Sequence, residues 1–99
     1  MRFAPPAFLA PPWPNPANSP ANLRVGISPA EEGARASVRI HDLAGRLVRT
    51  VQDGPLSAGV HTLTWDLHDE SGRTVAPGLY LVRAETNRFT TVHRVIVIR

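Results

Sequence analysis

Residues 38–51 constrain the fold more than any other stretch of this 99-residue chain. Val38 and Ile40 alternate with polar neighbours, which is the two-residue period of a strand with one buried face. Asp42 and Gly45 then supply turn chemistry, because aspartate bonds nearby backbone N–H groups and glycine adopts positive φ without steric cost. Apolar and polar residues mix again after the turn, so the stretch predicts a β-hairpin.

Similar runs recur along the chain and are separated by turn residues at intervals of roughly 8 to 12 positions. Trp65 shares one face of its run with Leu63 and His61, and we expect it to be the centre of the core. No window shows a sustained helical period. The pattern predicts an all-β antiparallel sandwich of six or seven strands, including strands near residues 23–27, 60–66, 79–82 and 89–98.

Length and composition limit the classes of function. Ninety-nine residues suit one domain with its own core. The absence of cysteine removes thiol catalysis, disulfides and thiolate metal sites. All eleven basic residues are arginine, and the formal net charge of +3 is mild, so it indicates solubility more than it names a partner. No apolar run approaches the roughly 20 residues that span a bilayer, so we expect no membrane insertion.

Residues 1–20 hold seven of the ten prolines and predict an extended arm that ends in a hinge, with the sandwich domain following at residues 21–99. The prolines also interrupt any apolar core of a signal peptide, so export either precedes this numbering or does not occur. The arm carries apolar side chains that gain from leaving water, so we expect a docking role for Phe3, Phe8, Leu9 and Trp13. The surface they dock on is either the arm's own domain or a neighbouring copy.

The last strand loses its alternation in the run Val95, Ile96, Val97 and Ile98. A strand that is apolar on both faces must be covered on both faces. We predict that the sandwich core covers one face and that the arm or a second chain covers the other. These four residues are therefore candidate interaction residues.

An ordered series of motifs resembles a known pair of domain groups. The motifs are residues 41–49 (His-Asp-Leu-Ala-Gly-Arg-Leu-Val-Arg), 58–61, Trp65-Asp66, Asp69, Gly72, 77–81 and the closing 93–99, with Pro-Asn-Pro-Ala-Asn at 14–18 as the opening. They resemble the immunoglobulin-like domain of the flagellar hook-capping protein and the C-terminal sorting domain of bacterial type IX secretion cargo. The resemblance covers about residues 14–99 and implies an immunoglobulin-like sandwich.

The chain departs from that pattern at three positions. Tyrosine is usual where His41 stands, glycine is usual at Leu67, and lysine is common at Arg94. A sorting domain also normally follows a large cargo protein, whereas only a short arm precedes the sandwich in this sequence.

The sequence contains no motif that indicates a catalytic or metal-binding site. None of the five serines lies in Gly-x-Ser-x-Gly, and no serine, histidine and carboxylate triad can be assembled from spacing, so we expect no enzyme activity. Asp66 and Asp69 are interpreted as turn caps rather than calcium ligands. The spacings of His61, His68 and His93 match no zinc signature. We expect no cofactor and no metal.

Arginines offer one further surface. Arg24, Arg35 and Arg39 are predicted to point outward from neighbouring strands, with Arg46 and Arg49 near the same hairpin, where an acidic surface or cell-surface polysaccharide could bind. A solvated β face is the alternative. Nucleic acid is not expected, because no aromatic side chains are interleaved with these arginines.

The sequence thus predicts a non-enzymatic extracellular or cell-surface structural module. Our first hypothesis is self-assembly into a filament or other polymer, with the arm of one molecule docked beside the last strand of the next. Head-to-tail contacts of this kind generate rings or open filaments. The alternatives are a type IX sorting or attachment domain, whose partner is the secretion machinery, and a flagellar hook assembly scaffold domain.

Overall fold

A computed structural model describes residues 7–98, which form seven strands. A short 3-10 turn, Pro29–Glu31, joins the second and third of them. The strands are β1 (Phe8–Leu9), β2 (Ala21–Ile27), β3 (Arg35–His41), β4 (Leu47–Pro55), β5 (Gly59–Trp65), β6 (Gly78–Glu85) and β7 (Thr90–Val97). Within this range no helix has the length and apolar character needed to cross a membrane.

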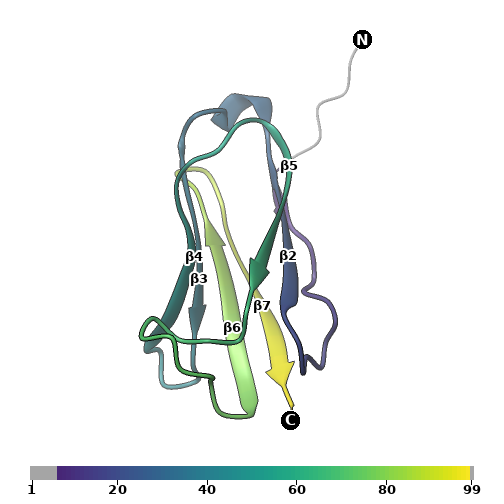
Figure 1. The fold of residues 1–99 in the computed structure, drawn as a ribbon. Coiled ribbons are helices and arrows are strands. Elements are labelled where there is room, and N and C mark those ends of the chain that lie inside the picture. The colour runs from purple at the N-terminus through teal and green to yellow at the C-terminus, as the bar shows by residue number, and fades with distance from the viewer. Residues whose placement is uncertain (1–6, 99) are drawn as a thin grey trace.

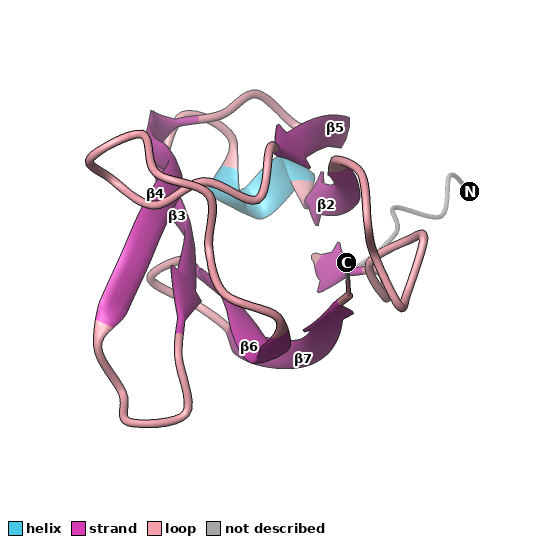
Figure 2. Cartoon of the chain, turned by 60° about the horizontal axis from the view of Figure 1, so that its bottom comes forward, coloured by secondary structure: helices cyan, strands magenta, loops and turns pink. Residues whose placement is uncertain are grey.

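The strands form two antiparallel sheets packed face to face, which confirms the predicted all-β, immunoglobulin-like sandwich (Figures 1 and 2). One sheet has the order β1-β2-β5 and the other has the order β4-β3-β6-β7. Beyond β2 the chain passes through the 3-10 turn into the opposite sheet. Strands β2 and β3, which are neighbours in sequence, therefore lie in different layers.

The predicted hairpin is present as β3 and β4 at one edge of the four-stranded sheet. The Asp42 carboxylate accepts hydrogen bonds from the backbone N–H groups of Ala44 and Arg46 at 2.9 and 3.0 Å, and Gly45 has φ 85°. Strand β4 extends from Leu47 to Pro55. Proline is tolerated there because β4 is an edge strand.

A second turn repeats this chemistry in the loop between β5 and β6. Asp69 Oδ1 accepts hydrogen bonds from the backbone N–H groups of Ser71 and Arg73 at 2.9 and 3.0 Å, and Gly72 also has φ 85°. Asp66 likewise caps the N–H of His68 at 3.1 Å. These bonds confirm the prediction that Asp66 and Asp69 act as turn caps.

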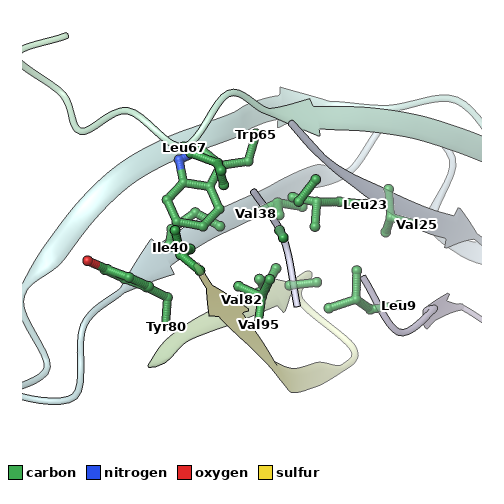
Figure 3. Close-up of a cluster of buried hydrophobic side chains, with 14 of the residues drawn as sticks. Leu9, Leu23, Val25, Val38, Ile40, Trp65, Leu67, Tyr80, Val82 and Val95 are labelled. Atoms are coloured by element: carbon green, nitrogen blue, oxygen red, sulfur yellow. The ribbon is translucent and has the colours of Figure 1, made fainter. Parts of the chain in front are cut away.

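The core lies between the sheets around Trp65, whose side chain is 1% exposed, as predicted (Figure 3). Its indole Nε1 donates to the His68 carbonyl at 2.9 Å, and its ring meets Tyr80 edge-on at 5.5 Å between centroids. The Tyr80 hydroxyl in turn donates to the Ala76 carbonyl at 2.6 Å. Each polar atom of this aromatic pair therefore has a partner, which removes the cost of burying it.

Leu67 has φ 63°, in the left-handed region that favours glycine. This geometry gives a physical reason for the glycine that is usual at this position. The leucine side chain is buried, and its carbonyl accepts the Val75 N–H at 2.9 Å. Burial of the side chain offsets the backbone strain of about 1–2 kcal/mol.

Candidate functional site

The described part of the arm, residues 7–20, packs on the chain's own sandwich. Phe8 and Leu9 form β1, which pairs antiparallel with β2 in the register Phe8↔Gly26 and Leu9↔Val25. The Phe8 ring covers Gly26 so closely that a Cβ added there would lie 2.1 Å from the ring. Phe3, the remaining predicted arm residue, lies outside the described residues.

Leu9 is the arm residue that enters the core. It is 6% exposed and lies in the same cluster as Val25, Val82 and Val95 (Figure 3). Its carbonyl accepts a hydrogen bond from His93 Nε2 of β7 at 2.7 Å. Because β1 belongs to one sheet and β7 to the other, this contact bridges the two layers on one side of the sandwich.

Further along the arm, Asn15 and Ala17 pair with the free edge of β7. The Asn15 side-chain amide accepts from the Ile96 N–H at 2.9 Å and donates to the Arg94 carbonyl at 3.1 Å, as a backbone peptide group would. Ala17 then exchanges two backbone bonds, its N–H to Ile96 at 2.7 Å and its carbonyl to Ile98 at 2.8 Å. An otherwise open strand edge is thereby paired within the chain.

Trp13 lies between these two contacts and stays half exposed, at 44%. Its backbone exchanges hydrogen bonds with Asn22 at 2.7 and 3.2 Å. The Arg24 guanidinium stacks over its ring at 5.8 Å from the centroid. Trp13 therefore covers the start of β2 without entering the core.

The four predicted residues of the last strand divide into two pairs. Val95 and Val97 point into the core and are 0% and 1% exposed, whereas Ile96 and Ile98 point outward and are 45% and 42% exposed. We predicted that both faces would be covered. Within residues 7–98 the outward face stays open, because the described part of the arm pairs with the edge of β7 and not with its face.

Ile96 belongs to an exposed apolar band on the outward side of the four-stranded sheet, in which Arg94 lies between Val92 and Ile96 on β7. Leu79 of β6 is its register partner, and Leu81 follows two residues further along the same face. Val92 of β7 and Leu47 of β4 are 48% and 49% exposed on this side. Sequence reasoning missed Leu81 and Val92, although an apolar residue at an outward position of an alternating strand was the available signal.

The predicted arginine surface is not one surface. Arg24 lies on β2 of the three-stranded sheet, whereas Arg35 and Arg39 lie on β3 of the other, so the prediction of neighbouring strands is wrong. The chain changes layer at the 3-10 turn between them. Arg46 pairs with its own turn residue Asp42 at 3.0 Å, and Arg49 binds the carbonyl of Asp69 at 3.2 Å.

Arg39 instead faces an arginine that sequence reasoning did not single out. Arg83 of β6 is its register partner, with Glu85 and Ser37 opposite each other in the next outward row. Hollows of about 160, 220 and 370 Å³ lie along this face, and the residues that line them include Arg35, Ser37, Arg39, His41, Leu81, Arg83, Glu85 and Val92. We call this face, with those eight residues, the outer groove.

Three carboxyl groups have lowered pKa values, each through a local donor. The backbone N–H of Arg46 lowers the pKa of Asp42, the Ser71 hydroxyl lowers the pKa of Asp69, and the Arg35 guanidinium lowers the pKa of Asp53. Arg35 holds Asp53 through two bonds at 2.7 and 2.8 Å. These groups stabilise turns and the sheet edge.

The three histidines considered as zinc ligands each bond a backbone carbonyl instead. His61 and His68 bond Ser57 and Asp66 at 2.8 Å, and His93 bonds Leu9 as described above. Among residues 7–98 no three histidine or carboxylate side chains come together as a metal site would require.

Comparison with known proteins gives matches of two kinds. The FlgD Ig-like domain family matches residues 15–88. The basal-body rod modification protein FlgD is 42% identical over 55 residues in Salmonella typhimurium and 37% identical over 57 residues in Escherichia coli. Those alignments take in 56% and 58% of this chain, which spans about a quarter of each relative, 24% and 25%.

Solved structures share the fold across nearly the whole chain. PorU from Porphyromonas gingivalis, described as dimeric and latent, superposes with a TM-score of 0.72 at 25% identity, over 93% of this chain and 9% of PorU. PorZ, a surface component of the type IX secretion system of the same organism, superposes with a TM-score of 0.58 at 22% identity, over 94% of this chain and 11% of PorZ. Both resemblances expected from the motifs are therefore present, and the match over residues 15–88 establishes that the chain belongs to the FlgD Ig-like domain family.

Proposed function

We propose that this chain is a non-enzymatic docking domain of a larger bacterial surface or secretion assembly, and that it docks through the outward side of its four-stranded sheet. The observation that carries the proposal is the exposed apolar band on that side. Ile96, Val92 and Leu47 are each between 45% and 49% exposed, on a face that residues 7–98 leave uncovered. Exposed apolar side chains gathered on one face are a feature of protein interaction surfaces.

The shape of the domain supports a place in series within a longer assembly. β1 pairs with the end of β2 at Gly26, whereas β7 finishes beside Gly78 at the opposite end of the sandwich (Figure 1). The described chain therefore enters at one end and leaves at the other. Covalent connections at the two ends would leave the broad sheet faces free for docking.

Within this proposal we favour an attachment or sorting domain located at the cell surface or outside the cell. The likeness to PorU, at 25% identity over 93% of the chain, supports this version. The secretion machinery would then be the partner. The identity to FlgD supports the other version, a scaffold domain of the flagellar hook.

A reporter fusion tests the proposal. The full chain is fused behind a fluorescent protein in a bacterium with type IX secretion, and surface delivery is measured by protease accessibility in intact cells. We expect delivery with the native sheet face and its loss in the double variant Val92→Glu, Ile96→Glu. The matched control is Thr62→Glu, Thr64→Glu on the exposed face of β5, which should deliver normally.

Two results would contradict the proposal. One is delivery that is equal in the sheet-face and control variants. The other is retention of the native fusion together with failure to restore a flagellar strain whose FlgD lacks its own Ig-like domain. Restoration in that strain without surface delivery would favour the hook-scaffold version.

Self-assembly through the arm stays a prediction. In this structure Leu9 and Phe8 fill sites on their own domain, so docking on a neighbour requires β1 to exchange between copies and remake the same contacts there. Sedimentation velocity of the full chain tests it. Concentration-dependent polymers that disappear when the chain begins at Asn22, while circular dichroism still shows a folded β domain, support exchange, and a full chain that is a monomer at all concentrations contradicts it.

A further inference from the structure

The outer groove joins two unlike features. Its middle is cationic, since the register partners Arg39 and Arg83 point outward from adjacent strands. One end is aliphatic, because the hollow of about 220 Å³ that contains Arg83 is also lined by Leu81 and Val92. The hollows share residues from one to the next, so they form one continuous depression across β3 and β6.

The arginine pair is incompletely neutralised. Like charges directly opposite each other on a sheet are destabilising. The nearest carboxylates are distant for hydrogen bonds, with Arg39 at 3.5 Å from Asp53 and Arg83 at 3.8 Å from Glu85. Asp53 is already held by Arg35 at 2.7 and 2.8 Å. Both guanidinium groups therefore keep donors available to an anion in the groove.

The spacing of these features matches an extended peptide. Along a strand, side chains on one face repeat every second residue, about 6.6–7 Å apart. Leu81 and Arg83 have this spacing on β6. A peptide lying along the strands with a carboxylate and an aliphatic residue two positions apart would meet the arginine pair and the aliphatic end together.

Other anionic ligands fit less well. Single-stranded nucleic acid needs aromatic rings for base stacking, and the described residues that line the groove include no Phe, Tyr or Trp. A sugar ring would find only the His41 imidazole as an aromatic surface. Arginines flanked by aliphatic side chains are instead the composition of a protein interface.

We propose that the outer groove binds an extended, acidic segment of a partner protein, with an Asp or Glu carboxylate between Arg39 and Arg83 and an aliphatic side chain on Leu81 and Val92. Paired guanidinium groups give short, charge-assisted hydrogen bonds to a carboxylate. This inference rests on the proposed docking function and names the chemistry of the partner.

The test uses blocked pentapeptides and the ¹⁵N-labelled full chain in NMR titrations. The probe is acetyl-Ser-Glu-Ser-Leu-Ser-amide, and its matched controls replace Glu by Gln or Leu by Ser. We expect amide shifts in β3 and β6, with affinity about tenfold weaker for the Gln peptide, which loses the charged hydrogen bonds. The variants Arg39→Gln and Arg83→Gln should weaken binding of the Glu peptide similarly, and Arg73→Gln in the β5–β6 loop should not.

Several outcomes would overturn the inference. These are equal binding of the Glu and Gln peptides, shifts confined to β2 and β5, and equal loss with Arg73→Gln. Different results would contradict the acidic ligand and the docking function. Surface delivery that depends on Val92 and Ile96 without peptide binding would leave docking intact and remove the acidic partner. Peptide binding together with delivery that does not depend on Val92 and Ile96 would leave the acidic ligand intact and remove the docking function.

Discussion

Two apolar parts of this chain, the arm at residues 7–17 and the outward face of β7, differ in how far they are buried. The arm supplies Leu9 and Ala17 to the core, at 6% and 0% exposure, while Ile96 and Ile98 remain at the surface. Hydrophobicity does not distinguish them, since isoleucine is at least as apolar as alanine. The difference is that the arm satisfies its backbone by pairing with β2 and β7, so it can close the side of the sandwich.

Pairing along the edge of a strand and covering its face are therefore separate requirements. Asn15 and Ala17 occupy the edge of β7, where unpaired N–H and carbonyl groups would otherwise invite another strand. They leave its outward side chains uncovered. The covered edge is expected to serve stability, and the open face is expected to serve binding.

Truncation of the Leu9 side chain should have the largest effect on the stability that the arm contributes. Leu9→Ala removes a buried side chain and leaves a cavity between the layers, so we expect a loss of about 2–4 kcal/mol in the free energy of unfolding. Ile96→Ala is the matched control on the open face and should cost under about 1 kcal/mol. Urea unfolding followed by tryptophan fluorescence measures both, and equal losses would show that the arm does not belong to the core.

A methyl group at Gly26 should disturb the arm from the other side. In Gly26→Ala the new Cβ meets the Phe8 ring and forces it away, which should cost about 1–3 kcal/mol. In a Phe8→Ala background the same substitution should be close to neutral. The double-mutant cycle measures this coupling, and strict additivity of the two changes would contradict the contact.

Loss of the Asn15 amide should have a smaller effect. Asn15→Ala leaves the Ile96 N–H and the Arg94 carbonyl without their side-chain partner. We expect this loss to lower the free energy of unfolding by about 1–2 kcal/mol. Asn18→Ala, at an exposed position of the same segment, should change stability by less than about 0.5 kcal/mol. Amide hydrogen exchange at Ile96 gives a local readout, and unchanged protection there would refute the role of Asn15.

Acid should affect the sandwich at sites other than the arm, because the carboxyls with lowered pKa values lie in turns and on the β3–β4 face. A lowered pKa in the folded state stabilises the protein above the unfolded pKa near 4. That stability is lost as the pH falls through the folded pKa values of Asp42, Asp53 and Asp69. Thermal unfolding should therefore occur at lower temperature at pH 3 than at pH 7.

The double variant Asp42→Asn, Asp69→Asn should flatten this pH dependence. Asn15→Ala should instead lower the melting temperature by the same amount at both pH values, since an amide does not titrate. A pH-dependent effect of Asn15→Ala would contradict this separation of the arm from the acid-sensitive turns.

Much of the fold follows from local pattern. Alternation places Leu23, Val38, Ile40 and Val82 inward, and the Asp-x-x-Gly-Arg sequences at 42–46 and 69–73 form matching turns because both the aspartate cap and the glycine φ are local requirements. Trp65 could be placed at the centre of the core from its size and its strand alone. The resemblance to known domains then identified the family.

The candidate site depended on contacts that no local pattern contains. Arg39 and Arg83 are 44 positions apart and meet only because β3 pairs with β6, whereas Arg24, nearer in sequence, lies in the other layer. His41 and Leu81 likewise face each other only because β3 pairs with β6. Local periodicity predicts the side of a strand on which a residue lies, but not which strand becomes its neighbour.

Local pattern in the sequence is enough to predict the class of fold, the turns, and an arm whose apolar side chains gain from leaving water. The packing of the strands shows where residues 7–20 of that arm lie and which apolar face residues 7–98 leave open. The physical reason is that burial is a property of single residues and local pattern, whereas edge pairing and sheet order require groups far apart in the chain to satisfy one another's hydrogen bonds.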